Sequence, residues 1–338
     1  MLSAHQVGNK NNGEDLFASR APIDISDDRL QELLLKYFLT PFNSQEYYHF
    51  TFTNMDFKMN PLYIYCTQIF EETSDFHLCS INIAKHLYEV SNHPLIKQGD
   101  LFVARFSDLF IDGETVDAIG IFKSENRQPF IKIDQRKSQF TMQYEDGINI
   151  EKMDKGCLIL RTEKDAGYKV CIVDKANKGG EAQFWRDSFL MLRQRNDDFH
   201  QTRDIMNITK NYVTQQLTED FEVNKPDQIE ILNRSIEYFK SNDNFDKDAF
   251  EQEVFQQPEI IQSFRKFDES YRNDHDIQVA DSFEISPQAV KKQARVFKSV
   301  LKLDRNFHIY IHGNKELIEQ GVDPDGRKFY KIYYNQEN

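Results

Sequence analysis

The sequence predicts an α+β fold. An antiparallel strand meander with attached helices would form the N-terminal half, and a mostly helical C-terminal half would be closed by a β-hairpin. Apolar and polar side chains alternate at period two through much of residues 101–174, and this alternation returns after residue 306. Between these regions, apolar residues recur at three- and four-residue spacing. Runs of strands followed by runs of helices are typical of α+β proteins.

Two amphipathic helices are predicted before the strands begin. Ser26 is a suitable N-cap for the first, which would end before Pro41. Ser80 is suitable for the second, which would end near Pro94. Their apolar faces would be formed by Leu30, Leu33, Leu34, Tyr37 and Phe38 in the first helix and by Ile83, Ala84, Leu87 and Tyr88 in the second.

The strands that follow are predicted at DLFVARFSDLFI, VDAIGIFKS, PFIKI, GCLILRT and YKVCIVDK. Asp112-Gly113 favours a hairpin between the first two, and Asp165-Ala166-Gly167 lies between the last two. We therefore expect one antiparallel meander, which ends at the turn-rich sequence KANKGG. Because a chain of this length favours two domains, we predict an α+β domain at residues 1–178 and a helical domain at residues 179–338.

The C-terminal half is predicted to be helical from residue 181 to about Leu301. Helices are expected to start near Asp227 and near Pro258, where a first-turn proline is tolerated. After them, NFHIYIHGN and RKFYKIYYN alternate as strands and flank the turn sequence DPDG. The intervening KELIEQG is predicted to form one helical turn.

Composition indicates a folded protein that does not enter a membrane. The chain has 28 Phe and 15 Tyr for its cores, and no apolar run approaches the ~20 residues of a membrane helix. The N-terminal sequence lacks the apolar segment of a signal peptide, so we expect a cytoplasmic protein. The four cysteines (Cys66, Cys79, Cys157 and Cys171) lie far apart and are expected to be buried thiols, neither disulfides nor zinc ligands.

Charge is distributed unevenly along the chain. Overall, 55 acidic residues outnumber 42 basic ones. Residues 222–285 contain 16 acidic and 7 basic residues, whereas residues 286–338 contain 10 basic and 6 acidic ones. The sign therefore changes at Ser286-Pro287, a dipeptide that also suits a helix start.

A basic stripe is predicted on the helix that begins there. Val290, Ala294, Phe297 and Leu301 would form its buried face, and Lys291, Arg295, Lys298 and Lys302 repeat the same spacing one residue later. From Lys291 to Lys302 the stripe would run ~16 Å, long enough to meet several phosphates of a duplex. The residues predicted to contact DNA are Lys291, Lys292, Arg295, Lys298, Lys302 and Arg305.

Two other interpretations of the stripe remain open. The cations could simply solvate an amphipathic helix while their methylene stems cover the edge of the core. They could also pair with the acidic helices of residues 222–285. Since screening at physiological salt acts over ~8 Å, the negative total charge alone does not forbid DNA contact.

The sequence offers no catalytic signature. Asp117, Lys123 and Glu125 could belong to a metal-dependent nuclease, but the usual order places Glu before Lys. An ordinary cross-strand ion pair is the favoured interpretation of Lys123 and Glu125. Neither a G-x-S-x-G nor an H-E-x-x-H motif occurs. We therefore expect a non-enzyme with no cofactor and no metal.

Several segments, taken as an ordered set, resemble a known family. HQVGNK, SINIAKHLYEVSNHPLIKQGDLFVARF, IGIFKSE, AQFWRDSF, LKLDRNFHIYIHGN and KFYKIYY are similar to the bacterial 37-kDa nucleoid-associated proteins, the NdpA-like family. The resemblance covers nearly the whole chain. It implies a cytoplasmic protein located at the nucleoid that binds double-stranded DNA, with a candidate link to topoisomerase or other nucleoid proteins. It supplies no binding residue.

Two hypotheses of function follow. The first is a nucleoid-associated protein that binds double-stranded DNA non-specifically through phosphate contacts of the basic residues. The alternative is a protein-interaction module that reaches the chromosome through a partner such as a topoisomerase. In that case the acidic helices of residues 222–285 would dock a basic surface of the partner.

Overall fold

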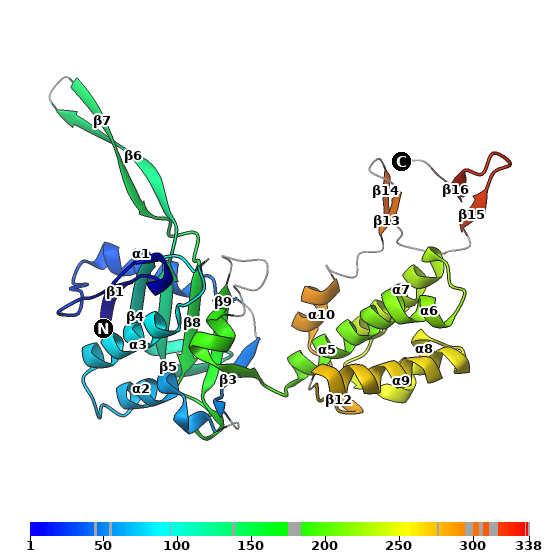
Figure 1. Cartoon of the computed structure of the whole chain (residues 1–338), viewed down its shortest axis with the longest axis horizontal. Helices are drawn as coiled ribbons and strands as arrows, with labels where there is room; N and C mark the ends of the chain where they lie inside the picture. The colour runs from blue at the N-terminus through cyan, green and yellow to red at the C-terminus, as the bar shows by residue number, and fades with distance from the viewer. Residues whose placement is uncertain are drawn as a thin grey trace. The chain divides into compact units, whose positions relative to one another are not determined.

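A computed structural model gives the structure of the protein for residues 1–43, 46–53, 56–94, 96–136, 139–174, 184–275, 277–294, 300–303, 307–310, 317–334 and 336, without the side chains of residues 136, 300–302, 308 and 310. The chain divides into two compact units, Met1–Arg195 and Asn196–Asn338 (Figure 1). This division lies C-terminal to the predicted boundary at residue 178, because a π-helix (Phe184–Leu190) and a short strand, β10, still pack on the sheet of the first unit.

The first unit is built on an antiparallel sheet with the strand order β10-β3-β9-β8-β5-β4-β1-β2. The predicted meander is its centre, formed by β4, β5, β8 and β9. Asp112 and Gly113 both have positive φ, 53° and 85°, as the predicted tight hairpin requires. The strands are β1 (Leu2–Val7), β2 (Leu16–Ala18), β3 (Tyr47–Phe50), β4 (Gly99–Ile111), β5 (Glu114–Ser124), β8 (Lys155–Leu160), β9 (Lys169–Asp174) and β10 (Leu192–Gln194).

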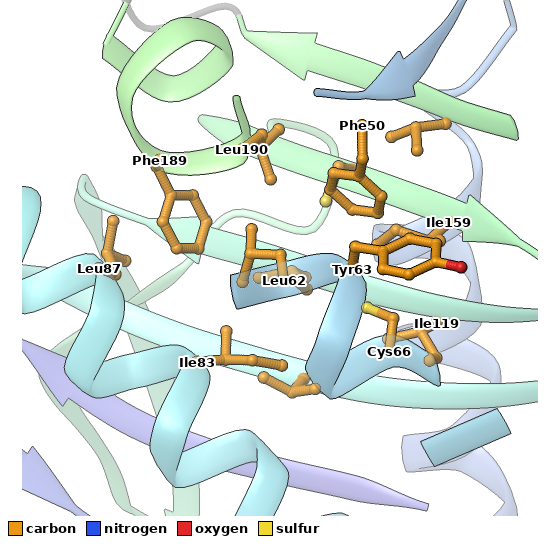
Figure 2. Close-up of a cluster of buried hydrophobic side chains, with 14 of the residues drawn as sticks. Phe50, Leu62, Tyr63, Cys66, Ile83, Leu87, Ile119, Ile159, Phe189 and Leu190 are labelled. Carbon is orange, nitrogen blue, oxygen red and sulfur yellow. The ribbon is translucent and has the colours of Figure 1, made fainter. Parts of the chain in front are cut away.

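Helices bury both faces of this sheet. One core contains Ile119 and Ile121 of β5 together with side chains of α2 (Pro61–Phe70) and α3 (Phe76–Val90). Figure 2 shows side chains of both helices directed at this sheet face, beside the π-helix. The other core contains Ala118 and Phe122 of β5 together with side chains of α1 (Asp28–Leu39). In this core Phe38 of α1 lies against Phe122, with ring centroids 4.3 Å apart. The predicted alternation of apolar and polar side chains therefore does not hold in the centre of the sheet, where all six residues of β8 are buried.

The predicted helix caps of this unit were wrong, although both helices exist. Asp27, not Ser26, caps α1 by accepting a hydrogen bond from the backbone N–H of Leu30. Asp75 caps α3 in the same way, so Ser80 lies inside this helix. The four cysteines are buried and free, as expected.

A separate hairpin interrupts the meander after β5. It consists of β6 (Arg127–Arg136) and β7 (Gln139–Ile148), which pair with each other in a sheet of their own. Figure 1 shows this arm extending away from the large sheet. The prediction that PFIKI continues the meander was therefore wrong.

The second unit is a helical bundle around an aromatic core. Tyr212 lies at its centre, where its ring contacts Phe255 and Phe264 and its hydroxyl donates to the Ile260 carbonyl at 3.1 Å. A two-stranded ribbon pairs β11 (Asn244–Asp246), which lies just before α8, with β12 (Ser282–Glu284), which follows α9. The helices are α5 (Asp198–Asn211), α6 (Leu217–Asp220), α7 (Lys225–Ser241), α8 (Lys247–Val254), α9 (Pro258–His275) and α10 (Pro287–Ala294).

Two hairpins end the chain. A closing hairpin is confirmed, with β15 (Ile318–Val322) and β16 (Lys328–Ile332) flanking the DPDG turn. Its first strand differs from the predicted one, because NFHIYIHGN pairs instead with VLKL. KELIEQG was predicted as a helical turn, but its second half belongs to β15. The other hairpin pairs β13 (Val300–Leu303) with β14 (Phe307–Tyr310). Side chains of both hairpins pack on Ile229 of α7 in a small apolar cluster with Leu303, Ile309, Ile318 and Tyr330.

A buried histidine links the sheet of the first unit to α3. His5 of β1 is 3% exposed, and its Nδ1 accepts from the Ser19 backbone N–H at 3.2 Å. Its Nε2 therefore carries the proton and donates to Ser80 Oγ at 3.0 Å. Burial and then the neighbouring His77 lower the pKa of His5 to about 4. The imidazole is neutral in the folded protein at pH 7.

Stability of the first unit should therefore fall as the pH drops from 7 towards 4. In this window only the unfolded chain gains a proton at His5, which costs up to about 3 kcal/mol at the acid end. Urea unfolding, followed by fluorescence of the buried Trp185, measures this at each pH. His5→Gln should flatten the dependence without abolishing it, because burial also lowers the pKa of His49 and His86. An unchanged pH dependence in His5→Gln would contradict this assignment.

Candidate nucleic-acid interface

The helix predicted after Ser286-Pro287 forms and begins as expected. Pro287 is its first residue, and Ser286 Oγ accepts from the Ala289 backbone N–H at 3.4 Å. The Ser286 backbone N–H donates to Thr202 Oγ1 of α5 at 3.0 Å, which fixes the start of α10 against the bundle. Thr202 is fully buried, so this anchor is protected from water.

The first turns of α10 bury one side and expose the other. Ala289 and Val290 are buried, and the helix contacts α5 and α7. Lys291 and Lys292 are exposed. Lys292 Nζ lies 5.7 Å from the ring centroid of Phe199, within the range of a cation–π contact. Both predicted contact residues on this helix therefore face water beside an ordered core.

The continuous stripe from Lys291 to Lys302 was predicted wrongly. The helix ends at Ala294, and Lys302 belongs to β13, where its backbone is paired with His308. The sequence VLKL suits a strand as well as a helix, and FHIY offers it an antiparallel partner. Arg295, Lys298 and Arg305 lie outside the described residues. That any of the six residues contacts DNA stays a prediction.

The acidic helices satisfy their buried carboxylates with their own cations. Glu251 is fully buried, and Arg265 contacts it at 2.5 Å. Asp268 is 2% exposed and accepts from Arg272 at 2.6 Å, with Lys247 at 3.4 Å. By contrast, no ion pair involves Lys291 among the residues that the structure describes. For Lys291, therefore, the alternative interpretation that the cations of this helix pair with the acidic helices does not hold.

The closing hairpin adds basic residues that the sequence reasoning did not assign to the interface. Arg327 and Lys328 are exposed at the start of β16. Lys331 lies 4.7 Å from the ring of Tyr333 and 3.5 Å from a Glu319 oxygen. The signal was present in RKFYKIYY, since cations interleaved with aromatic residues are typical of nucleic-acid surfaces.

The residues considered for a nuclease do not come together. Asp117 accepts from Arg161 at 3.3 Å and lies six residues along β5 from Lys123, or ~20 Å. Lys123 and Lys155 both donate to Glu125, at 2.9 and 2.7 Å, and all three side chains are 1–3% exposed. The Lys123–Glu125 pair lies at the end of one strand and is not cross-strand as predicted. No cluster of three or more potential metal ligands occurs in the described ranges.

This buried trio should stabilise the fold. Glu125→Ala would leave two buried ammonium groups without their carboxylate, so we expect a loss of about 3–5 kcal/mol in the free energy of unfolding. Urea titration followed by Trp185 fluorescence measures it. Glu32→Ala breaks the exposed pair with Arg29 and is the matched control, expected to cost about 1 kcal/mol or less. Equal losses in the two variants would contradict the structural role.

Comparison with known proteins supplies a family. In the parts of the chain that the structure describes, no helix is long and apolar enough to cross a membrane. A search of curated proteins gave no match. A family model described as nucleoid-associated protein YejK matches residues 3–327, a range that includes nearly all of the large sheet, the helical bundle and β15 of the closing hairpin. The protein therefore belongs to this family of nucleoid-associated proteins.

Proposed function

We propose that the protein binds double-stranded DNA non-specifically, through phosphate contacts and without catalysis. The contacts are assigned to Lys291, Lys292, Arg295, Lys298, Lys302 and Arg305, with Arg327 and Lys328 of the closing hairpin as additional candidates. The observation that carries the proposal is the exposure of Lys291 and Lys292 on an ordered helix. Family membership supports a chromosomal role.

Electrostatics favours this surface over the rest of the second unit. Four of the seven cations in residues 222–285 are held by carboxylates of the same region: Arg234, Lys247, Arg265 and Arg272. Such pairs have little charge left to offer a phosphate. The exposed ammonium groups of Lys291 and Lys292 can instead replace counterions of the duplex, which is the main source of non-specific affinity. Exposed aromatic residues in and just after the closing hairpin, Phe329 at 42% and Tyr334 at 69% exposure, can pack against the sugars of the duplex.

DNA affinity should depend steeply on salt. With four to six phosphates neutralised, log affinity should fall against log salt concentration with a slope of roughly −4 to −5. Lys291→Glu/Lys292→Glu should weaken binding to any duplex sequence and make the slope shallower by about 2. Fluorescence anisotropy with duplexes of unrelated sequence, titrated at several salt concentrations, measures both quantities.

A charge-matched control separates local contacts from total charge. Lys240→Glu/Lys266→Glu changes the net charge equally but places the reversals on α7 and α9, where both lysines are exposed. We expect a near-normal slope in this variant. If both double variants lose affinity equally, the α10 lysines are not the contact surface.

A second candidate function is recruitment to the chromosome by a basic protein partner such as a topoisomerase. It is favoured by carboxylates that remain exposed on the acidic helices and their flanks, such as Asp248 at 84% and Asp281 at 86%. This function predicts negligible affinity for naked DNA at physiological salt in the anisotropy assay. It also predicts that Asp248→Lys/Asp281→Lys abolishes partner binding while Lys291→Glu/Lys292→Glu does not.

A further inference from the structure

The β6–β7 arm displays large apolar side chains to water. Ile131, Ile133, Phe140, Met142 and Tyr144 are 71%, 61%, 71%, 74% and 75% exposed. Exposed apolar residues are common on proteins when they are scattered singly. Here they are concentrated in one hairpin, and contiguous exposed apolar patches usually mark interaction sites.

The register of the hairpin places all five on one face. Ile131 is opposite Tyr144, and Ile133 is opposite Met142. Phe140 follows at the next level toward the tip, opposite Gln135. Directly paired residues share a face and side chains alternate along a strand, so these residues form one apolar stripe.

The opposite face of the arm is polar at the levels of the stripe, although Phe130, nearer the base, is 48% exposed on it. Between the same levels, Lys132 is paired with Gln143, and Asp134 is paired with Thr141. All four are exposed or half-buried. This face needs no covering surface, because its charged, amide and hydroxyl side chains are well solvated by water. The arm is therefore one-sided, like a strand pair taken from the surface of a larger core.

An isolated strand pair with one apolar face is not stable in water by itself. Among the described residues, β6 and β7 form ladder hydrogen bonds with each other and belong to no larger sheet. The missing stabilisation has to come from a surface that covers the stripe. Because the stripe is aliphatic and aromatic, the surface that covers it should be apolar as well.

We propose that the stripe packs face to face against the same stripe of a second copy of the chain, about a two-fold axis near the Ile133–Met142 pair. A two-fold interface uses the same patch on both subunits and so requires a self-complementary surface. The Ile133–Met142 level is central, with one apolar level toward the base of the arm and one toward the tip. Rotation about this point places apolar levels opposite apolar levels.

The area available is sufficient for a specific dimer. Large side chains bury roughly 150–200 Å² each, and these five are mostly exposed. Packing the two stripes would remove about 500–600 Å² per arm, or roughly 1,100 Å² in total. That is near the lower limit of about 1,000 Å² for a biological interface. The affinity should therefore be moderate and sensitive to a single change in the stripe.

Sedimentation velocity of the full chain tests the proposal. The wild type should show a monomer–dimer equilibrium at micromolar concentration, and Ile133→Asp/Met142→Asp should sediment as a monomer. Thr141→Asp/Gln143→Asp adds the same charge on the polar face and should dimerise like the wild type. A wild type that stays monomeric, or equal dimerisation in both double variants, would overturn the proposal.

Cross-linking gives a second measurement that keeps the arm almost intact. The native cysteines are buried, so a single introduced cysteine is the reactive thiol. A short bismaleimide should link Ile133→Cys to itself across the axis, whereas Lys132→Cys, on the outer face, should stay monomeric. Equal cross-linking of the two variants, or none for Ile133→Cys, would exclude face-to-face packing about this axis.

Discussion

Two buried carboxylates determine how charge is arranged in the second unit. Glu251 and Asp268 lie in the interior between α8 and α9, where an unpaired negative charge would be very costly. Arg265, Arg272 and Lys247 are held against them. With these three cations paired, the acidic helices keep exposed lysines such as Lys240 and Lys266 among an excess of carboxylates. The helix that follows, α10, supplies Lys291 and Lys292.

The first unit depends on a different constraint, the burial of its sheet on both faces. Phe38 and Phe122 pack on one side, while α2 and α3 cover the other. Such a sheet leaves little of its own surface for a partner. The surfaces that remain for interaction in this unit are its appendages, and the β6–β7 arm is the most apolar of those described. The proposed DNA contact and the proposed self-association therefore lie on separate elements of one chain, so variants of one should leave the other unchanged.

Local patterns were sufficient to predict the elements with near neighbours in sequence. The meander from β4 to β9 and the helix α9 follow from period-two and three-to-four spacing, and the DPDG turn fixes the closing hairpin. The strands β1, β3 and β10 were missed because their partners are distant in sequence. PFIKI alternates like a sheet strand, so its pattern could not show that the hairpin would be separate. The same limit applies to VLKL, since its amphipathic spacing fits a helix until FHIY is available as a strand partner.

For the candidate site, the start of α10 was predictable from Ser286-Pro287. The exposure of Lys291 and Lys292 was not predictable, because the sequence cannot show which cations the carboxylates of the acidic helices hold.

The central claim is that lysines of α10 touch DNA while lysines of the acidic helices do not. Lysine-directed chemical modification of the full chain, with and without duplex DNA and read by mass spectrometry, tests it at single residues. The claim predicts that DNA protects Lys291 and Lys292 and leaves Lys240 and Lys266 as reactive as in the free protein. Equal reactivity of Lys291 and Lys292 with and without bound DNA would contradict it.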